Sequence, residues 1–151
     1  MARAQIPEGL TADYENIEVQ QALAALQATP DYERLAAFLQ SLREGYLVVD
    51  VTGTHRDKAT HIRTIRSTRG QLLLPAFTSM AQLRLAVPKG KADQAKGAIL
   101  PALEALRLIR SDRFVAAQFN AGSAALVVLR KYVDLVLDGA PIEPAALETM
   151  G

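Results

Sequence analysis

"LLLPAFTSM", residues 72–80, is the stretch that decides how the rest of the sequence is interpreted. Three consecutive leucines without polar alternation predict a short strand that is covered on both faces. The hydroxyl residues Thr78 and Ser79 come directly after this apolar run. Ser79 stands three residues before Gln82, a spacing typical of a helix that begins with a capping box. The stretch therefore predicts a strand over 71–77 and a helix directly after it.

The segments before this stretch have a helical period. "IEVQQALAALQA" after Asn16 and "DYERLAAFLQSLRE" after Pro30 each place apolar residues three or four positions apart. Asn16 is a good N-cap, and Gly45 suits the C-terminal end of the second helix. Because the gap between the two helices is short, we expect a helical hairpin. "YLVVDV", residues 46–51, is apolar and β-branched and predicts a strand.

The segments after the opening stretch complete the fold. The patterns predict two further strands separated by the turn "NAGS", at 113–119 and 124–130, and two further helices, at 101–111 and 131–138. Residues 61–67 are another strand candidate, and 87–97 read as a basic loop or a short helix. The sum is an α+β fold, with an N-terminal helical hairpin followed by a mixed β-sheet with helices packed on it.

The length of 151 residues fits a single domain that spans 1–151. We expect residues 1–15, which contain Pro7 and Gly9, to form an extended N-terminal arm, and residues 140–151 to form a C-terminal tail. The absence of cysteine excludes disulfides, thiol nucleophiles and cysteine-ligated metal sites. No stretch reaches the ~18 apolar residues of a membrane span or the apolar core of a signal peptide. We therefore expect a cytoplasmic protein.

Charge is distributed unevenly, although the net charge is only +1. Residues 1–50 carry eight acids and three bases (−5), residues 51–133 carry four acids and fourteen bases (+10), and residues 134–151 carry four acids and no base (−4). Five of the bases lie close together in the sequence: Arg56, Lys58, Arg63, Arg66 and Arg69. An exposed cluster of this kind binds phosphate or acidic groups. The alternative is a solvated face, or an edge strand that its charges protect from pairing.

Two polar turns are candidates for a binding site. The backbone N–H groups after Thr78 and Ser79 would point outward from a helix start, which favours an anion. In the second turn, Gly122 permits close backbone approach, while Asn120 and Ser123 can donate hydrogen bonds. If the strands that precede the two turns are neighbours in the sheet, both turns open at one edge. The alternative is that Ser79 only caps its helix and the second turn only reverses the chain.

Metal binding and catalysis find little support in the residues. Asp50, His55 and Asp57 lie close together, with His61 beyond them. A metal site needs several converging ligands, whereas this segment is rich in Arg and Lys, which repel a cation. No nucleophile elbow, phosphate-binding loop or dinucleotide motif is present. We therefore expect no metal, no cofactor and no catalytic residue. The alternative is a small-molecule enzyme that uses a Lys, or a His such as His55, near the two turns.

Two stretches together, "GQLLLPAFTSMAQL" and "FNAGSAALVVLRKYVDLVL", resemble the SseB family in its N-terminal domain. That family shows a strand and turn of the form LPVFTS before a short helix, and later an Asn-Pro-Gly-Ser-like turn between a strand and the next strand. Residues 74–79 match the first element, and Asn120, Gly122 and Ser123 match the second. Ala121 stands where the family usually has proline.

The resemblance spans roughly residues 15–139, and "LVVDV" at 47–51 fits the family's first strand. It implies a bacterial family that is named for an effect on serine sensitivity and has no agreed catalytic residues. We therefore expect a non-enzymatic regulatory or protein-interaction module that binds an acidic partner, a small anion, or a second copy as a homodimer. A second alternative is a weak nucleic-acid binder that uses residues 56–69. Few aromatic residues are available for base stacking, however, and we expect neither a nucleic-acid nor a membrane partner.

Overall fold

The computed structural model describes residues 3–52, 64–88 and 90–150. The strands in these ranges are β1 (Arg3–Gln5), β2 (Tyr46–Asp50), β3 (Ile65–Arg66), β4 (Leu72–Ala76), β5 (Lys96–Pro101), β6 (Ala116–Phe119) and β7 (Leu126–Leu129). The α-helices are α1 (Ile17–Ala28), α2 (Tyr32–Ser41), α3 (Met80–Ala86), α4 (Ala102–Arg107), α5 (Arg130–Asp138) and α6 (Pro144–Met150). Two short 3₁₀ helices are η1 (Ala92–Gln94) and η2 (Leu108–Ser111).

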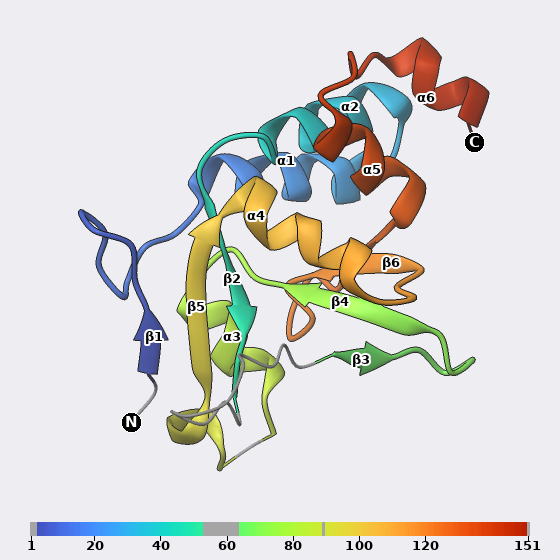
Figure 1. Cartoon of the computed structure of the whole chain (residues 1–151). Helices are drawn as coiled ribbons and strands as arrows, with labels where there is room; N and C mark the ends of the chain where they lie inside the picture. Colours follow the sequence, from blue (N-terminus) through green and yellow to red (C-terminus); the bar gives the residue numbers. More distant parts are fainter. Residues whose placement is uncertain (1–2, 53–63, 89, 151) are drawn as a thin grey trace.

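The strands form two mixed sheets (Figure 1). The first has the order β1-β5-β2, with β1 parallel and β2 antiparallel to β5. The second has the order β3-β4-β6-β7, in which the central pair β4–β6 is parallel and both outer pairs are antiparallel. Val48 of β2 and Phe77 after β4 exchange backbone hydrogen bonds of 2.8 and 2.9 Å. This bridge joins the two sheets.

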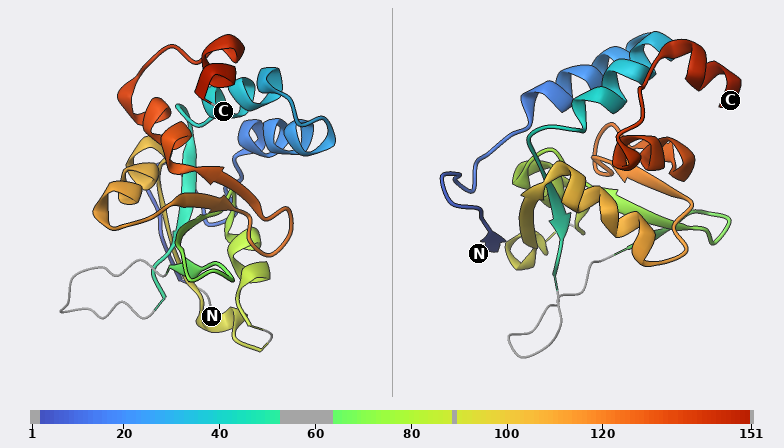
Figure 2. Two further views of the ribbon diagram at one scale, coloured as in Figure 1. Left: turned by 90° about the vertical axis from the view of Figure 1, so that its right-hand side faces the viewer. Right: turned by 45° about the horizontal axis from the view of Figure 1, so that its top comes forward.

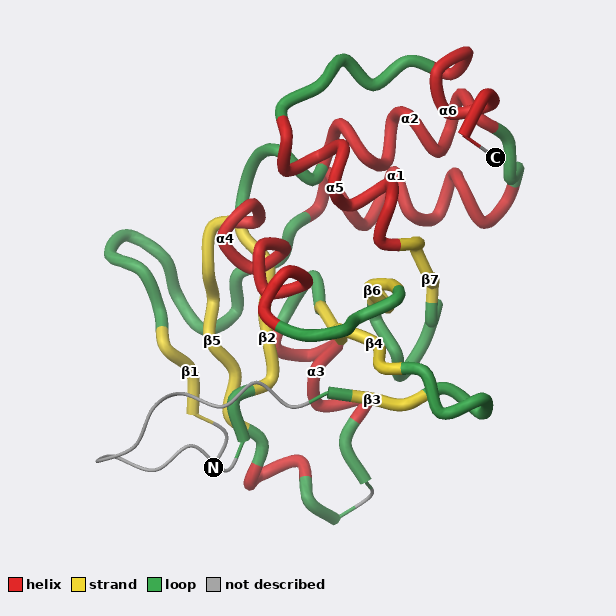
Figure 3. Tube along the Cα trace, turned by 45° about the vertical axis from the view of Figure 1, so that its right-hand side comes forward, coloured by secondary structure: helices red, strands yellow, loops and turns green. Residues whose placement is uncertain are grey.

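The helices cover the sheets from different sides. Helices α1, α2, α5 and α6 gather on one side of the molecule, and α3 lies apart from them beside β2 (Figures 2 and 3). The main hydrophobic core lies between the first group and the sheets, where the rings of Phe38 and Phe119 meet edge to face at 5.1 Å. A smaller cluster packs α3 against the first sheet through Val48, Met80 and Ile99.

The predicted α+β class and the N-terminal helical hairpin are confirmed. The Asn16 side chain caps α1, because its Oδ1 accepts a 3.1 Å hydrogen bond from the Val19 N–H. Its Nδ2 donates to the Tyr46 carbonyl at 2.9 Å and so ties the start of α1 to β2. The second helix begins at Tyr32, and the Asp31 carboxylate caps it by accepting from the Arg34 N–H.

Strand β5 is the central element that the sequence patterns missed. Residues 87–97 read as a loop or a short helix because Gly97 and Ala98 have low strand propensity. In the structure β5 is the central strand of its sheet. A Cβ atom at Gly97 would lie 2.4 Å from the Met80 sulfur, so the missing side chain lets α3 pack directly on the strand. Tertiary packing here overrides local propensity.

Both terminal segments contain regular structure. The N-terminal segment 1–15, expected to be an extended arm, includes β1, which pairs with β5. Residues 140–151, expected to be a tail, include α6, whose Leu147 is fully buried among the core residues. The Gln40 side chain also donates to the Ile142 carbonyl at 2.7 Å. Among the described residues, no helix has both the length and the apolar character that crossing a bilayer requires.

Candidate functional site

The two polar turns meet at one end of the four-stranded sheet, because the strands that precede them are neighbours. Strands β4 and β6 are parallel neighbours, with Ala76 opposite Phe119 at their C-terminal ends. Thr78 and Asn120 follow these ends in sequence. We call this edge, where β4 and β6 finish, the turn end of the sheet.

Thr78 and Asn120 bind each other at the turn end. The Thr78 N–H donates to Asn120 Oδ1 at 3.0 Å, and Asn120 Nδ2 donates to the Thr78 hydroxyl oxygen at 3.1 Å. Gln20 of α1 donates to the same hydroxyl at 3.0 Å. Thr78 is 0% exposed and Asn120 4% exposed. The polar groups expected to receive a ligand are therefore buried, and they form their hydrogen bonds within the protein.

The backbone of Asn120 forms the corner of the second turn. Its φ is 53°, in the left-handed region that asparagine tolerates better than most residues. Its N–H donates to the Ala76 carbonyl at 2.9 Å, and its own carbonyl accepts from Ser123 at 3.0 Å and from Ala125 at 2.9 Å. Asn120 thus fixes both the path of the turn and its contact with the end of β4.

Ser79 caps helix α3, which confirms the predicted helix start. Its hydroxyl oxygen accepts a 3.2 Å hydrogen bond from the Gln82 N–H. The Gln82 side chain, which a capping box would direct back to the Ser79 N–H, instead accepts a 2.7 Å hydrogen bond from the Ser123 hydroxyl. The first turn of α3 is therefore bonded to the second polar turn.

Gly122 lies against the far end of the same helix. A Cβ atom built on it would lie 2.4 Å from the carbonyl carbon of Leu85 and 2.6 Å from the amide nitrogen of Ala86. These are backbone atoms, so a side chain at this position could be accommodated only if the turn or the helix moved. Thr78, Ser79, Asn120, Gly122 and Ser123 together form a joint between β4, β6 and α3.

Replacing Ser79 with alanine is expected to lower the free energy of unfolding by about 1 kcal/mol, because the Gln82 N–H loses its cap. Urea unfolding followed by circular dichroism measures this change. Ser79→Thr keeps the hydroxyl oxygen and should retain most of the stability. An alanine variant as stable as the unaltered protein would contradict the capping role.

The two predicted basic residues that the structure describes, Arg66 and Arg69, do not lie beside the turns. Arg66 ends β3 and Arg69 lies in the turn before β4, at the opposite end of the four-stranded sheet from Thr78. Across the five residues of β4 this separation is roughly 16 Å at ~3.3 Å per residue. Arg66 and Arg69 therefore do not share a surface with the two turns. Arg56, Lys58 and Arg63 lie outside the described residues.

The candidate metal ligands are largely outside the structure's described ranges. This applies to His55, Asp57 and His61, so the proposed use of His55 as a base cannot be placed in the fold. Asp50 is described, ends β2 and is buried. In the described part of the chain, no group of three or more His, Cys, Asp or Glu side chains could hold a metal ion.

Comparisons with known proteins identify the family. Comparison with curated proteins and with solved structures gave no match. Residues 19–140 match the family model described as the SseB protein N-terminal domain. The match includes β4, β6 and the whole joint formed by the two polar turns. Because it covers well over half of the sequence, this chain belongs to the SseB N-terminal domain family.

Proposed function

We propose that this SseB domain is a non-enzymatic, cytoplasmic interaction module that binds an acidic, partly apolar segment of a partner protein. The proposal is based on the side chains at the end of the four-stranded sheet opposite the turn end. There, arginines that make no ion pair among the described residues stand next to two exposed apolar side chains, Val127 and Leu129, on an open strand edge. We call this the basic end of the sheet.

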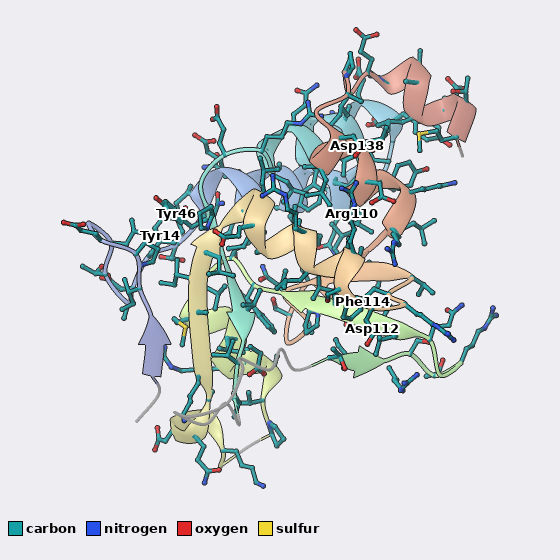
Figure 4. The ribbon with its side chains drawn as sticks, in the orientation of Figure 1. Tyr14, Tyr46, Arg110, Asp112, Phe114 and Asp138 are labelled. Carbon is teal, nitrogen blue, oxygen red and sulfur yellow. The ribbon has the colours of Figure 1, made fainter. Side chains whose placement is uncertain are left out.

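The basic end collects arginines from three segments that are distant in the sequence. Arg66 and Arg69 come from the β3–β4 hairpin, Arg113 precedes β6, and Arg130 follows β7. The Val115 N–H donates to the Leu72 carbonyl, and the Arg130 N–H donates to the Val115 carbonyl, so these segments lie side by side. Asp112 and Phe114, labelled in Figure 4, belong to the middle segment.

Not all of the nearby arginines are available to a partner. Arg110 forms ion pairs with Asp138 at 2.8 Å and Asp134 at 3.1 Å (Figure 4), and its hydrogen bonds to Asp138 and then Asp134 raise the pKa of the guanidinium. The Arg130 guanidinium donates to the backbone carbonyls of Asp112 and Phe114. The side chains of Arg69 and Arg113 are exposed and make no hydrogen bond or ion pair with the described residues.

An apolar row runs across the sheet next to these arginines. Strand register places Leu73, Ala116 and Leu129 side by side, one residue in from the basic end, but Leu73 and Ala116 are buried. Leu129 and Val127 of β7 are each 48% exposed, on the face opposite the buried Val128. These two side chains offer apolar contact to a segment whose acidic groups bind Arg69 and Arg113.

Strand β7 also offers backbone hydrogen bonds. It is the last strand in its sheet, with β6 on one side only. Because the Arg130 N–H points to β6, the alternation of an antiparallel ladder directs the N–H and C=O groups of Val127 and Leu129 away from β6. An extended segment can add to such an edge as a further strand. No charged residue lies within β7 to oppose pairing.

The joint at the turn end supports this choice of surface. Thr78 and Asn120 are buried and bonded to each other, and Ser79 bonds to its own helix. An anion at that end would have to displace existing hydrogen bonds. At the basic end, by contrast, a carboxylate would meet guanidinium groups that make no bond with the described residues.

Binding should weaken about tenfold or more when Arg69 and Arg113 are both changed to glutamate, since attraction becomes repulsion. A displayed library of random twelve-residue peptides provides the probe, and titration of the selected peptides gives affinities. We expect acidic, partly apolar peptides to be selected, and their affinity to fall as salt concentration rises.

The matched control is Arg84→Glu with Lys91→Glu, which changes the net charge equally but away from the basic end. This control should bind the selected peptides normally. Equal loss in both double variants would indicate a general charge effect. Failure to select any peptide, or self-association of the unaltered protein through β7, would contradict the proposal of a foreign acidic partner.

A further inference from the structure

A hollow of about 130 Å³ lies where the two sheets meet. Its lining comes from five separate segments: the end of β2, the start of β3, the β4 strand with the residue after it, the residues that end and follow α3, and the second polar turn. Most of the lining side chains are apolar, including Ile65, Pro75, Phe77, Val87 and Ala121. A cavity of this size matches a guest of about six heavy atoms, as in the ~150 Å³ cavity that accepts benzene.

One carboxylate belongs to this lining. Asp50 alternates along β2 with Val49 and therefore lies on the same face as Val48, toward α3. The residue is 8% exposed, although an aspartate is rarely buried without a partner. Its Oδ1 accepts a 2.9 Å hydrogen bond from the Thr52 N–H. Among the described residues, no cation pairs with Asp50 and no donor binds its Oδ2.

The apolar lining and the Asp50 carboxylate together favour a particular class of ligand. Apolar walls favour a hydrocarbon body, and a carboxylate whose Oδ2 accepts no hydrogen bond from the described residues favours a positively charged donor. A divalent cation would need several oxygen ligands, whereas the hollow offers one carboxylate and otherwise mainly apolar side chains. The contacts therefore favour an organic cation over a metal ion.

We propose that the hollow binds a small primary amine, with its ammonium group on Asp50 and its carbon chain against Phe77 and Pro75. The site is separate from the basic end, which attracts the opposite charge. A domain that binds an acidic protein segment at one surface and a small amine at another has the parts of a ligand-sensing module.

Protonated n-butylamine at pH 7 is the test probe, and butan-1-ol is its uncharged counterpart of equal length. Two-dimensional NMR of the isotopically labelled protein measures binding. We expect saturable shifts at the amides of Phe77, Val87 and Ala121, with a dissociation constant in the millimolar range. Butan-1-ol should bind at least tenfold more weakly because it carries no charge for Asp50.

Asp50→Asn should weaken amine binding at least tenfold. It keeps the oxygen that accepts from Thr52, so the melting temperature should not fall. The matched control, Asp112→Asn, changes an exposed aspartate that also accepts a backbone N–H. This control should bind n-butylamine normally.

Ala121→Leu offers an independent test, since it fills the hollow and leaves the carboxylate in place. Ala121→Leu should abolish the shifts from both probes. If Asp50→Asn does not fold, this variant alone tests whether the amine binds in the hollow. Equal binding of butan-1-ol, or normal amine binding in a folded Asp50→Asn variant, would overturn the proposal. Shifts that persist in a folded Ala121→Leu variant would also overturn it.

Discussion

Asn120→Ala is expected to destabilise the protein by about 3 kcal/mol, the largest effect of a single polar substitution at the joint. The buried Thr78 N–H would lose its acceptor, while the Thr78 hydroxyl would keep its bond from Gln20. An unsatisfied buried donor costs about 1–3 kcal/mol. The corner of the turn would also place alanine at a φ of 53°, without the local side-chain hydrogen bonding that lets asparagine tolerate this region. Urea unfolding followed by circular dichroism measures the total.

A glycine at the same position separates the two contributions. Asn120→Gly removes the side-chain hydrogen bonds but adopts the positive φ without strain. It should therefore be less destabilising than Asn120→Ala. If both variants unfold at the same urea concentration as the unaltered protein, the Thr78–Asn120 pair does not hold the strand ends together, and a ligand role for these residues would regain support.

Gly122→Ala is expected to destabilise the protein by about 2–3 kcal/mol through overpacking. The added methyl group would overlap the backbone of Leu85 and Ala86, and backbone atoms have no rotamer by which to move aside. The φ of Gly122 lies outside the left-handed region, so the effect comes from contact and not from local strain. Thermal and urea unfolding both report it.

Two further variants test this explanation. Ser123→Ala removes one exposed hydrogen bond to Gln82 beside Gly122 and should cost less than about 1 kcal/mol. Leu85→Ala should not rescue Gly122→Ala, because the overlap involves the main chain of Leu85 and not its side chain. A rescue would show that side-chain crowding was the cause, and normal stability of Gly122→Ala would show that the close approach is not required.

The sequence predicted the parts of the fold that depend on local chemistry. Asn16 and Ser79 mark helix starts because their side chains bond to nearby N–H groups. The apolar run before Thr78 predicted the buried strand. Strand β5 was missed because its place in the sheet depends on Gly97, whose role is visible only once α3 packs against it. Local propensity does not encode that contact.

The candidate site could be predicted only in part, for a related reason. The sequence named the two turns but not the strand order, and it is the parallel pairing of β4 and β6 that brings Thr78 and Asn120 together. The sequence does not reveal that the two polar side chains will use their hydrogen-bonding groups on each other, since this depends on distances across the sheet. The direction of β4 places Arg69 at the basic end of the sheet, away from the turns. That Arg113 lies beside it at the basic end follows from strand register alone.

Thr78 joins segments that are far apart along the chain. Its hydroxyl accepts from a residue 58 positions earlier, its N–H bonds to one 42 positions later, and its carbonyl accepts from the Asn16 N–H. Contacts that close such long loops form only after the loop-closure entropy has been overcome. We therefore expect the joint to form in the late steps of folding. Interactions completed late act mainly on the unfolding rate, so these few hydrogen bonds govern how long a folded molecule persists more than how quickly it forms.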